Sequence, residues 1–426
     1  MRHVMLVQRV LLAAALIATV PAHAVLKPVS DVGGLTQAIA NAAPGDIIEL
    51  AAGTYDVPGN LNCTAAGSAL APIVVRAASP QAAKLRFNGA GNTVEGFKVL
   101  APYWRFEGLD VEGTCAIDSN CEHAFHLIGD ADFTVIAGNH LRDFNAQIKS
   151  NNAASGSAAF PDDVQVTDNE IYDTRARSTS NPVTKIDVVG GRRWQVRANT
   201  IHDFQKDGGD TISYAAFLKG NSRDGVFERN LVTCTNAFSG GTRIGLSFGG
   251  GGTSPGTVCE DGTCIPEHQN GIMRNNLILA CSDVGIYLNN ATNSRVQHNT
   301  LYATSGIDVR FPASTADLRN NLMGGSIRNR DGGTSTQSGN VTGVADVTFA
   351  AWFVAPAGAD FTLVDGSSFV NLGVDAPLVT DDFCGNDRND GQPDIGALEY
   401  DADFHCTTTI GGGGPSDRLF YDGFES

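Results

Sequence analysis

Lys219 and Arg243 are the residues whose type and position best suit acid–base chemistry on an anionic substrate. In AAFLKGNS the alternation of apolar residues points Leu218 inward, aligned with Val188 and Leu246 of neighbouring strands. Lys219 is therefore expected to point outward. In GGTRIGLSFGG the same alternation turns Arg243 outward one repeat later. We expect the two cations on one face of adjacent repeats, about 5 Å apart.

Such a pair could remove the proton next to a carboxylate, as elimination across a uronate requires. An arginine neutralises the carboxylate through two parallel hydrogen bonds. A lysine whose pKa is lowered by neighbouring cations can then take the proton. The alternative for Lys219 is an ordinary exposed strand lysine.

The surrounding stretch is basic although the protein is acidic. Between Arg175 and Arg243, eleven Lys and Arg residues stand against six Asp and Glu residues, a net charge of +5. A basic groove of this kind would attract a polyanion, although several of these residues would be solvated turn residues. The candidate substrate-binding residues are Lys149, Lys185, His202 and Arg223. For His202, a hydrogen bond within its own turn is favoured over a role in proton transfer.

Three aspartates offer hard oxygen ligands for Ca²⁺. Asp187 lies in a strand-like segment, and Asp207 and Asp210 belong to the nearby sequence DGGD. These carboxylates could approach one another across adjacent repeats and bind calcium. The alternative is that DGGD is only a turn. The acidic segment 387–399 lacks the spacing of an EF-hand loop.

A recurring asparagine sets the architecture that would position these residues. An Asn followed by aliphatic residues recurs at intervals of 30, 30, 31, 46, 23 and 22 residues, at Asn139, Asn169, Asn199, Asn230, Asn276, Asn299 and Asn321. Short alternating strands flank each one. Asn tolerates the left-handed backbone of a tight corner, and its amide can bond to the same amide one repeat away. The pattern predicts an all-β fold, a right-handed parallel β-helix with an asparagine ladder at its corners.

The ends of the repeat region carry their own signals. Residues 35–43 form an amphipathic segment that would cover the open end of a stacked core, followed by PGDIIELAAGTYDV at 44–57. Residues 384–406 would close the other end. The predicted organisation is a signal peptide at 1–24, one β-helix domain at 25–403 with its N-terminal cap at about 30–57, and a Gly-rich linker and tail at 407–426.

The cap sequence, with its helix followed by PGDxIxLxxGxY, resembles that of polysaccharide lyases of the alginate lyase/chondroitinase B family. The closing DIGALE is similar to the end of many secreted bacterial β-helix proteins, and the DGFE tail to termini of exported proteobacterial proteins. The resemblance implies a lyase acting on an acidic polysaccharide, with Lys219 as base and Arg243 as neutraliser, and with Ca²⁺ as a possible cofactor. The Gly-rich surroundings of Arg243 depart from the family and leave the substrate open.

Charge and cysteine usage agree with an exported protein. The formal charge of −17 becomes −19 without Arg2 and Arg9 of the signal peptide. This acidity argues against nucleic acid as a partner. The apolar run of the signal peptide is too short to span a bilayer, and no second apolar run follows it. We therefore expect a secreted, periplasmic or surface protein that does not insert into a membrane. We also expect a monomer. Oxidising conditions favour the disulfides Cys115–Cys121, Cys259–Cys264, Cys384–Cys406 and Cys234–Cys281, with Cys63 left over.

Other functions remain open at this point. A glycoside hydrolase would need paired carboxylates at the cleft. In the stretch of long repeats, between Asn139 and Asn276, no adjacent pair of aspartates follows Asp162 and Asp163, which are in a loop. An epimerase of mannuronan would be expected to show Asp-Pro-His-Glu, which the sequence lacks. A non-catalytic carbohydrate-binding solenoid is compatible with every pattern described.

Overall fold

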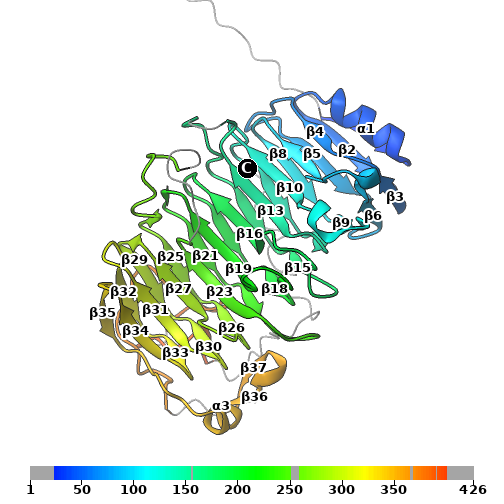
Figure 1. Cartoon of the computed structure of the whole chain (residues 1–426). Coiled ribbons are helices and arrows are strands. Elements are labelled where there is room, and N and C mark those ends of the chain that lie inside the picture. The colour runs from blue at the N-terminus through cyan, green and yellow to red at the C-terminus, as the bar shows by residue number, and fades with distance from the viewer. Residues whose placement is uncertain (1–23, 155–156, 251–258, 365–367, 390, 401–426) are drawn as a thin grey trace, which may run out of the picture.

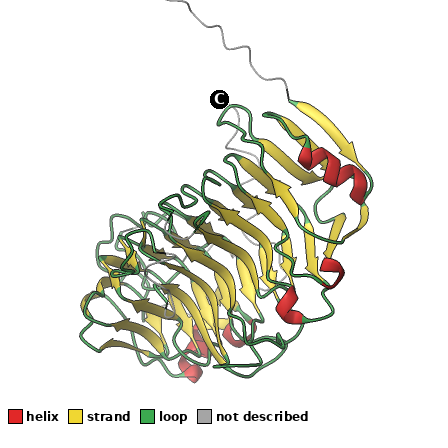
Figure 2. Ribbon diagram, turned by 45° about the horizontal axis from the view of Figure 1, so that its top comes forward, coloured by secondary structure: helices red, strands yellow, loops and turns green. Residues whose placement is uncertain are grey.

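Three long parallel sheets form the body of the protein, as the computed structural model shows (Figure 1). The structure describes residues 24–154, 157–250, 259–364, 368–389 and 391–400. The predicted signal peptide, the glycine linker and the tail lie outside these residues. Each turn of the chain contributes one strand to each sheet, so that the chain winds as a parallel β-helix (Figure 2).

Sheet I has twelve strands, and sheets II and III have ten each. Sheet I consists of β1 (Val25–Val29), β2 (Asp46–Leu50), β5 (Ile73–Ala77), β8 (Trp104–Glu107), β11 (Val135–Ala137), β14 (Gln165–Thr167), β17 (Gln195–Arg197), β21 (Val226–Glu228), β25 (Ile272–Arg274), β29 (Ser294–Gln297), β32 (Thr315–Arg319) and β35 (Thr334–Ser338). Sheet II consists of β4 (Leu61–Cys63), β7 (Phe97–Val99), β10 (His123–Ile128), β13 (Ala146–Asn151), β16 (Val183–Val189), β19 (Ile212–Lys219), β23 (Thr242–Phe248), β27 (Ile286–Asn289), β31 (Gly306–Arg310) and β34 (Ser326–Arg330). Sheet III consists of β3 (Gly53–Val57), β6 (Ala83–Phe87), β9 (Asp110–Gly113), β12 (His140–Arg142), β15 (Glu170–Tyr172), β18 (Thr200–His202), β22 (Leu231–Thr233), β26 (Leu277–Leu279), β30 (Thr300–Tyr302) and β33 (Leu322–Met323).

Shorter elements complete the fold. One small sheet contains β20 (Ser222–Arg223), β24 (His268–Gln269) and β28 (Ala291–Thr292). A second small sheet contains β36 (Phe353–Ala355) and β37 (Asp360–Leu363). The helices are α1 (Val32–Ala40), α3 (Asp346–Trp352) and the 3₁₀ turns η1 (Gly89–Gly91), η2 (Asp118–Asn120) and η3 (Pro356–Gly358).

The predicted asparagine ladder is confirmed. Each ladder amide donates from Nδ2 to Oδ1 of the next ladder residue, at 3.0 Å from Asn139 to Asn169 and at 2.8 Å from Asn321 to Asn340. Asn340 is a ladder residue that the sequence analysis did not predict. One detail of the prediction was wrong. The left-handed backbone belongs to the residue before each ladder asparagine, such as Asp168 (φ 56°) or Ala198 (φ 52°).

The two ends of the solenoid are covered differently. Helix α1 packs against β1 to β4 and buries Leu35 and Ile39 in the main core. Its Asp31 caps the helix by accepting a hydrogen bond from the Gly34 amide at 2.8 Å. The C-terminal segment differs in that it covers a side of the solenoid: α3 and the residues up to 400 pack against outward-facing Leu231, Leu277 and other residues of sheet III. This covers the C-terminal half of sheet III.

Disulfides reinforce the coils. The predicted pairs Cys115–Cys121, Cys234–Cys281 and Cys259–Cys264 are present, and Cys63 is a free, buried cysteine. Cys384 is disulfide-bonded, while its predicted partner Cys406 lies outside the described residues. None of the helices in the described part of the chain is long and apolar enough to cross a bilayer.

Candidate functional site on sheet II

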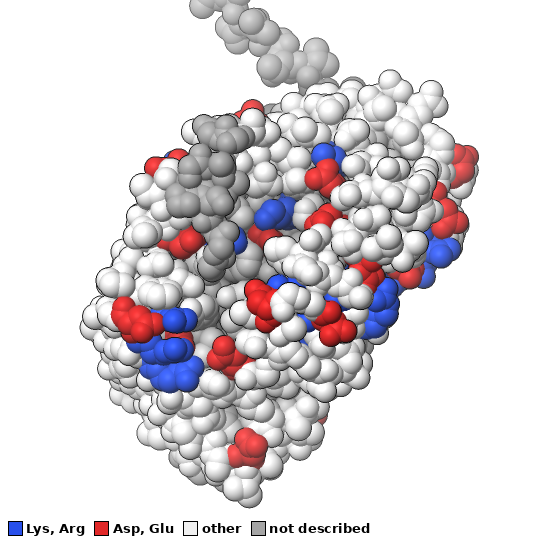
Figure 3. Space-filling model, viewed as in Figure 1, with Lys and Arg blue, Asp and Glu red and all other residues white. Residues whose placement is uncertain are grey.

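The outward face of sheet II carries a continuous row of polar and aromatic residues, one from each coil. Core residues alternate with them along each strand, so the pleat fixes which side chains reach the surface. The strand register aligns His126, Lys149, Asp187, Phe217, Ser247, Tyr287, Asp308 and Arg328. Side chains of opposite charge lie next to one another in a hollow of this face (Figure 3).

Lys219 is half-buried at the end of β19, level with Val189 of the preceding coil. Its ammonium lies 4.5 Å from the centre of the Phe217 ring. Burial lowers the pKa of Lys219, and the charge of Lys149 lowers it further, whereas Asp187 and Glu267 raise it. Lys219 thus has the environment of an activated amine, because loss of its proton relieves the cost of a buried charge.

Lys149 and Asp187 form an ion pair in the same row. The Lys149 Nζ atom lies 2.7 Å from Oδ1 of Asp187. Burial raises the pKa of Asp187, but Lys149 and Lys219 outweigh it and hold this pKa below its ordinary value. Lys149, a predicted substrate-binding residue, thus lies on the outward face of the sheet.

A cavity of about 570 Å³ continues the face toward the C-terminal coils. Its lining includes Tyr214, Ile244, Gly250, Tyr287 and Arg310. Gly250 also borders Lys219, because a Cβ atom at Gly250 would lie 3.4 Å from the Lys219 Cδ atom. The cavity therefore opens beside the lysine.

The predicted pairing of Lys219 with Arg243 is wrong. Leu218 lies opposite Phe248 and not Leu246, and Arg243 lies opposite Ser213. Arg243 is thus displaced from Lys219 by six residues along the strand, roughly 20 Å. A shift of two residues preserves the in-and-out alternation, so the pattern alone could not fix the register. This shift accounts for only part of the error, because an alignment of Leu218 with Leu246 would already place Arg243 four residues from Lys219 along the strand, roughly 13 Å.

Arg243 instead holds a loop together. Its side chain is buried, with 1% of the residue exposed. The guanidinium donates to the carbonyl oxygens of Cys234, Phe238 and Gly240 at 2.6, 2.9 and 3.0 Å, and to Oε1 of Gln205 at 2.5 Å. These bonds leave it no access to a substrate carboxylate.

The other predicted binding residues do not gather around Lys219. Lys185 is fully buried and ion-paired with Asp173 at 2.6 Å, so the prediction that it contacts substrate was wrong. His202 lies on β18 of sheet III, where its Nδ1 is 2.9 Å from Asp203 and its Nε2 is 3.3 Å from Glu170.

Arg223 is half-buried on β20, with Glu260 3.6 Å away. It therefore stands at a corner of the coil and outside the row on sheet II.

The predicted aspartate cluster for calcium does not form. Asp187 is paired with Lys149, Asp207 is exposed, and Asp210 is paired with Lys206. Asp187 also lies opposite Phe217. Phe217 is roughly 17 Å along β19 from the first residue of that strand, and Asp210 lies just before that first residue. The loop before β19 is too far from the middle of β16 for a shared ion.

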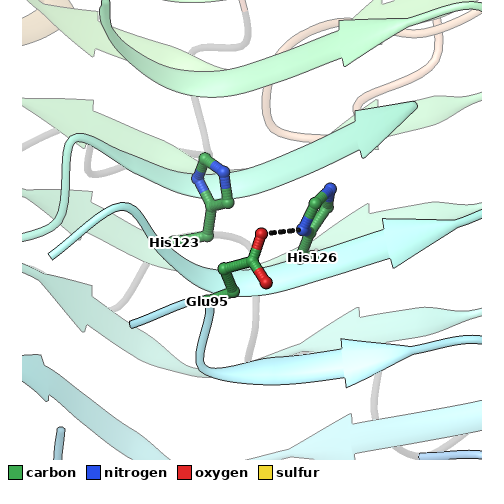
Figure 4. Close-up of side chains that lie close together, drawn as sticks. All are labelled: Glu95, His123 and His126. Atoms are coloured by element: carbon green, nitrogen blue, oxygen red, sulfur yellow. Dashed lines mark hydrogen bonds and ion pairs between the residues drawn. The ribbon is translucent and has the colours of Figure 1, made fainter. Parts of the chain in front are cut away.

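Sequence reasoning missed a cluster of Glu95, His123 and His126 on the N-terminal coils of the same sheet (Figure 4). His123 and His126 come from β10, and Glu95 precedes β7. In a regular strand, residues three apart point to opposite faces. His123 is the first residue of β10, where the chain leaves a corner, and this brings the two rings to 4.9 Å between centroids. The spacing HAFH was the available signal.

Comparison with known proteins agrees with this architecture. Residues 185–342 match the family model of the right-handed β-helix region. The crystal structure of pectate lyase Pel9A superposes with a TM-score of 0.60 at 16% identity, covering 86% of this chain and 90% of that one. The chain is a right-handed parallel β-helix. This β-helix is also similar to an alginate lyase from Paenibacillus sp. str. FPU-7, with a TM-score of 0.45, 15% identity and coverage of 74% and 98%.

A rhamnogalacturonan lyase matches the β-helix with a TM-score of 0.45 and 14% identity, covering 75% of this chain and 86% of that one. No curated protein sequence matches the chain. At 16% identity the likeness to pectate lyase Pel9A concerns the fold, and for the fold it agrees with the predicted resemblance to polysaccharide lyases.

Proposed function

We propose that the protein is a polysaccharide lyase that cleaves a uronate-containing polysaccharide by β-elimination on the face of sheet II. The observation that carries this proposal is the position of Lys219. It is half-buried beside an open cavity, and its pKa is lowered by burial and by the charge of Lys149. An amine whose pKa is lowered gives up its own proton more readily, so at the edge of the cavity it is suited to accept a proton from a bound sugar.

In the proposed reaction Lys219 takes the proton from the carbon next to the uronate carboxylate. The electron pair left behind forms a carbon–carbon double bond, and the glycosidic bond on the neighbouring carbon breaks. The leaving oxygen takes up a proton, so the products are a new hydroxyl end and an unsaturated uronate. Because Arg243 is buried, we assign binding of the carboxylate to Lys149, whose charge already acts on Lys219.

The acidic net charge of the whole protein is compatible with such a substrate. A bound polyanion responds to charges within about a Debye length, which is roughly 10 Å at moderate ionic strength. Lys98, Lys149 and Lys219 all lie along sheet II, on β7, β13 and β19. The disulfides fit an exported enzyme, since they persist in oxidising compartments.

The test is an assay for the unsaturated product. Purified protein is incubated with pectate, alginate, chondroitin and dermatan sulfate, with and without Ca²⁺, and the ultraviolet absorbance of the new double bond is followed. Lys219→Ala should lower the rate by about 10²–10⁴-fold, the usual contribution of a general base. Lys84→Ala is the matched control, because Lys84 lies on sheet III and pairs with Glu112.

Activity that survives in Lys219→Ala would place the base elsewhere. Absence of product on every polymer, with a polymer still retained by immobilised protein, would overturn the lyase and leave a carbohydrate-binding solenoid.

A further inference from the structure

Glu95, His123 and His126 bring one carboxylate and two imidazoles to a single point on the face of sheet II (Figure 4). One nitrogen from each histidine and one oxygen from Glu95 all lie within 4.8 Å of one another. His126 is nearly buried, and the other two residues are half-buried. The cluster is thus shielded on the sheet side and partly exposed on the outer face of sheet II.

The hydrogen bonds around His126 define which of its nitrogens is available. The Asn151 amide nitrogen donates to the carbonyl of Asn152 at 2.9 Å, which turns Oδ1 of Asn151 toward His126. This oxygen lies 2.6 Å from Nε2 of His126, so Nε2 carries a proton. The Nδ1 atom then faces a Glu95 carboxylate oxygen at 3.1 Å. In a neutral ring these two atoms are both acceptors, and only a proton or a cation between them makes the contact favourable.

His123 supplies a second free lone pair. Its Nδ1 atom is buried and has no hydrogen-bond partner among the described residues. A buried imidazole nitrogen without a partner carries a desolvation cost that a ligand would remove.

We propose that Glu95, His123 and His126 form a binding site for a divalent transition metal of the zinc class. Imidazole nitrogens select zinc, nickel or copper over calcium, which prefers oxygen ligands. Zinc bonds of about 2.0–2.2 Å require the widest ligand pair to close by roughly an ångström, which side-chain rotation supplies. Three protein ligands leave a fourth position for water or another ligand.

The outer contacts of the site are already in place. Metal-bound histidines donate their other N–H to an oxygen acceptor, as His126 does to Asn151. Metal-bound carboxylates are also hydrogen-bonded, and the second oxygen of Glu95 is held by Lys98. Lys98 is also the competitor of the metal, because its charge already balances that of Glu95. Binding of the ion must therefore overcome this pairing.

Isothermal titration of tag-free full-length protein with Zn²⁺ and Co²⁺ tests the proposal. The expected result is one ion per chain, with the visible absorption of Co²⁺ bound to nitrogen ligands. Glu95→Gln, His123→Ala and His126→Ala should each weaken binding more than about tenfold, since even outer-contact losses have that size. His140→Ala, which removes a more exposed histidine on sheet III, should bind as the unaltered protein does.

Asn151→Ala provides an independent check, because it alters no ligand and spares the fold. It should weaken Zn²⁺ binding by about 10–100-fold. Binding that is absent, or that persists unchanged in all three ligand variants, overturns the proposal. Because binding is measured without a polysaccharide, failure of the lyase assay leaves this result unaffected.

Discussion

Lys149 and Asp187 lie opposite each other on neighbouring strands of sheet II, with Nζ 2.7 Å from Oδ1. Both charges act on Lys219, in opposite directions: Lys149 lowers its pKa and Asp187 raises it. The two charges of the ion pair therefore help to set the pKa of Lys219, the proposed base. Each half of the pair can be removed separately.

We expect Asp187→Asn to move the acidic limb of the pH profile of kcat/KM toward lower pH. Loss of the negative charge lowers the pKa of Lys219 further, so the amine stays neutral in more acidic solution. Lys149→Met should move the same limb toward higher pH, because the cation that lowers the pKa is gone. Initial rates across the pH range check both. Shifts in the same direction would contradict the assignment of Lys219.

The buried pair of Lys185 and Asp173 offers a test of stability. Neither side chain is exposed, and Lys185 also donates to the carbonyl of Phe144. Lys185→Met leaves the buried Asp173 carboxylate without its ion-pair partner and should lower the free energy of unfolding by about 3–5 kcal/mol. The double variant Lys185→Met/Asp173→Leu should regain much of this loss. Urea unfolding measures both.

Asp331→Asn is the matched control for that experiment. It breaks an exposed ion pair with Arg310 and should cost less than about 1 kcal/mol. An equal loss in Asp331→Asn and Lys185→Met would contradict the argument from burial.

The repeat was readable from the sequence because each asparagine marks a corner. Asn139 and its successors recur with strands around them, and this fixes the solenoid without knowledge of any long-range contact. Register was not readable, since a slip of two residues keeps Leu218 inward while moving Arg243 two residues further from Lys219. The alternation also shows only which side chains share a face, and not how far apart they lie along the strand. The sequence also did not show which residues lie opposite each other on neighbouring coils.

The cluster of Glu95, His123 and His126 was missed for a related reason. The two histidines are three residues apart, and Glu95 belongs to the preceding coil. Only the three-dimensional path of the corner before β10 brings them together. Local periodicity carries no information about such a path.

His202 should make stability depend on pH. Hydrogen bonds to Asp203 and Glu170 outweigh its burial and raise the pKa of His202 above its ordinary value. A raised pKa contributes stability that is fully present below the unfolded value of about 6.5 and is lost as pH rises through the folded pKa. We expect the thermal midpoint of His202→Gln to fall less than that of the unaltered protein between neutral and alkaline pH. Parallel curves for the two proteins would refute this.

Arg243→Met separates a structural arginine from a catalytic one. The buried guanidinium holds the carbonyl oxygens of Cys234, Phe238 and Gly240. Its loss leaves these acceptors without a donor and should lower the free energy of unfolding by at least about 2 kcal/mol. Because Arg243 lies roughly 20 Å along the strand from the level of Lys219, the folded variant should keep the pH profile set by that lysine. The test is to measure both denaturation and lyase activity of this variant. A variant with unchanged stability and a lost kcat would show that Arg243 belongs to the active site.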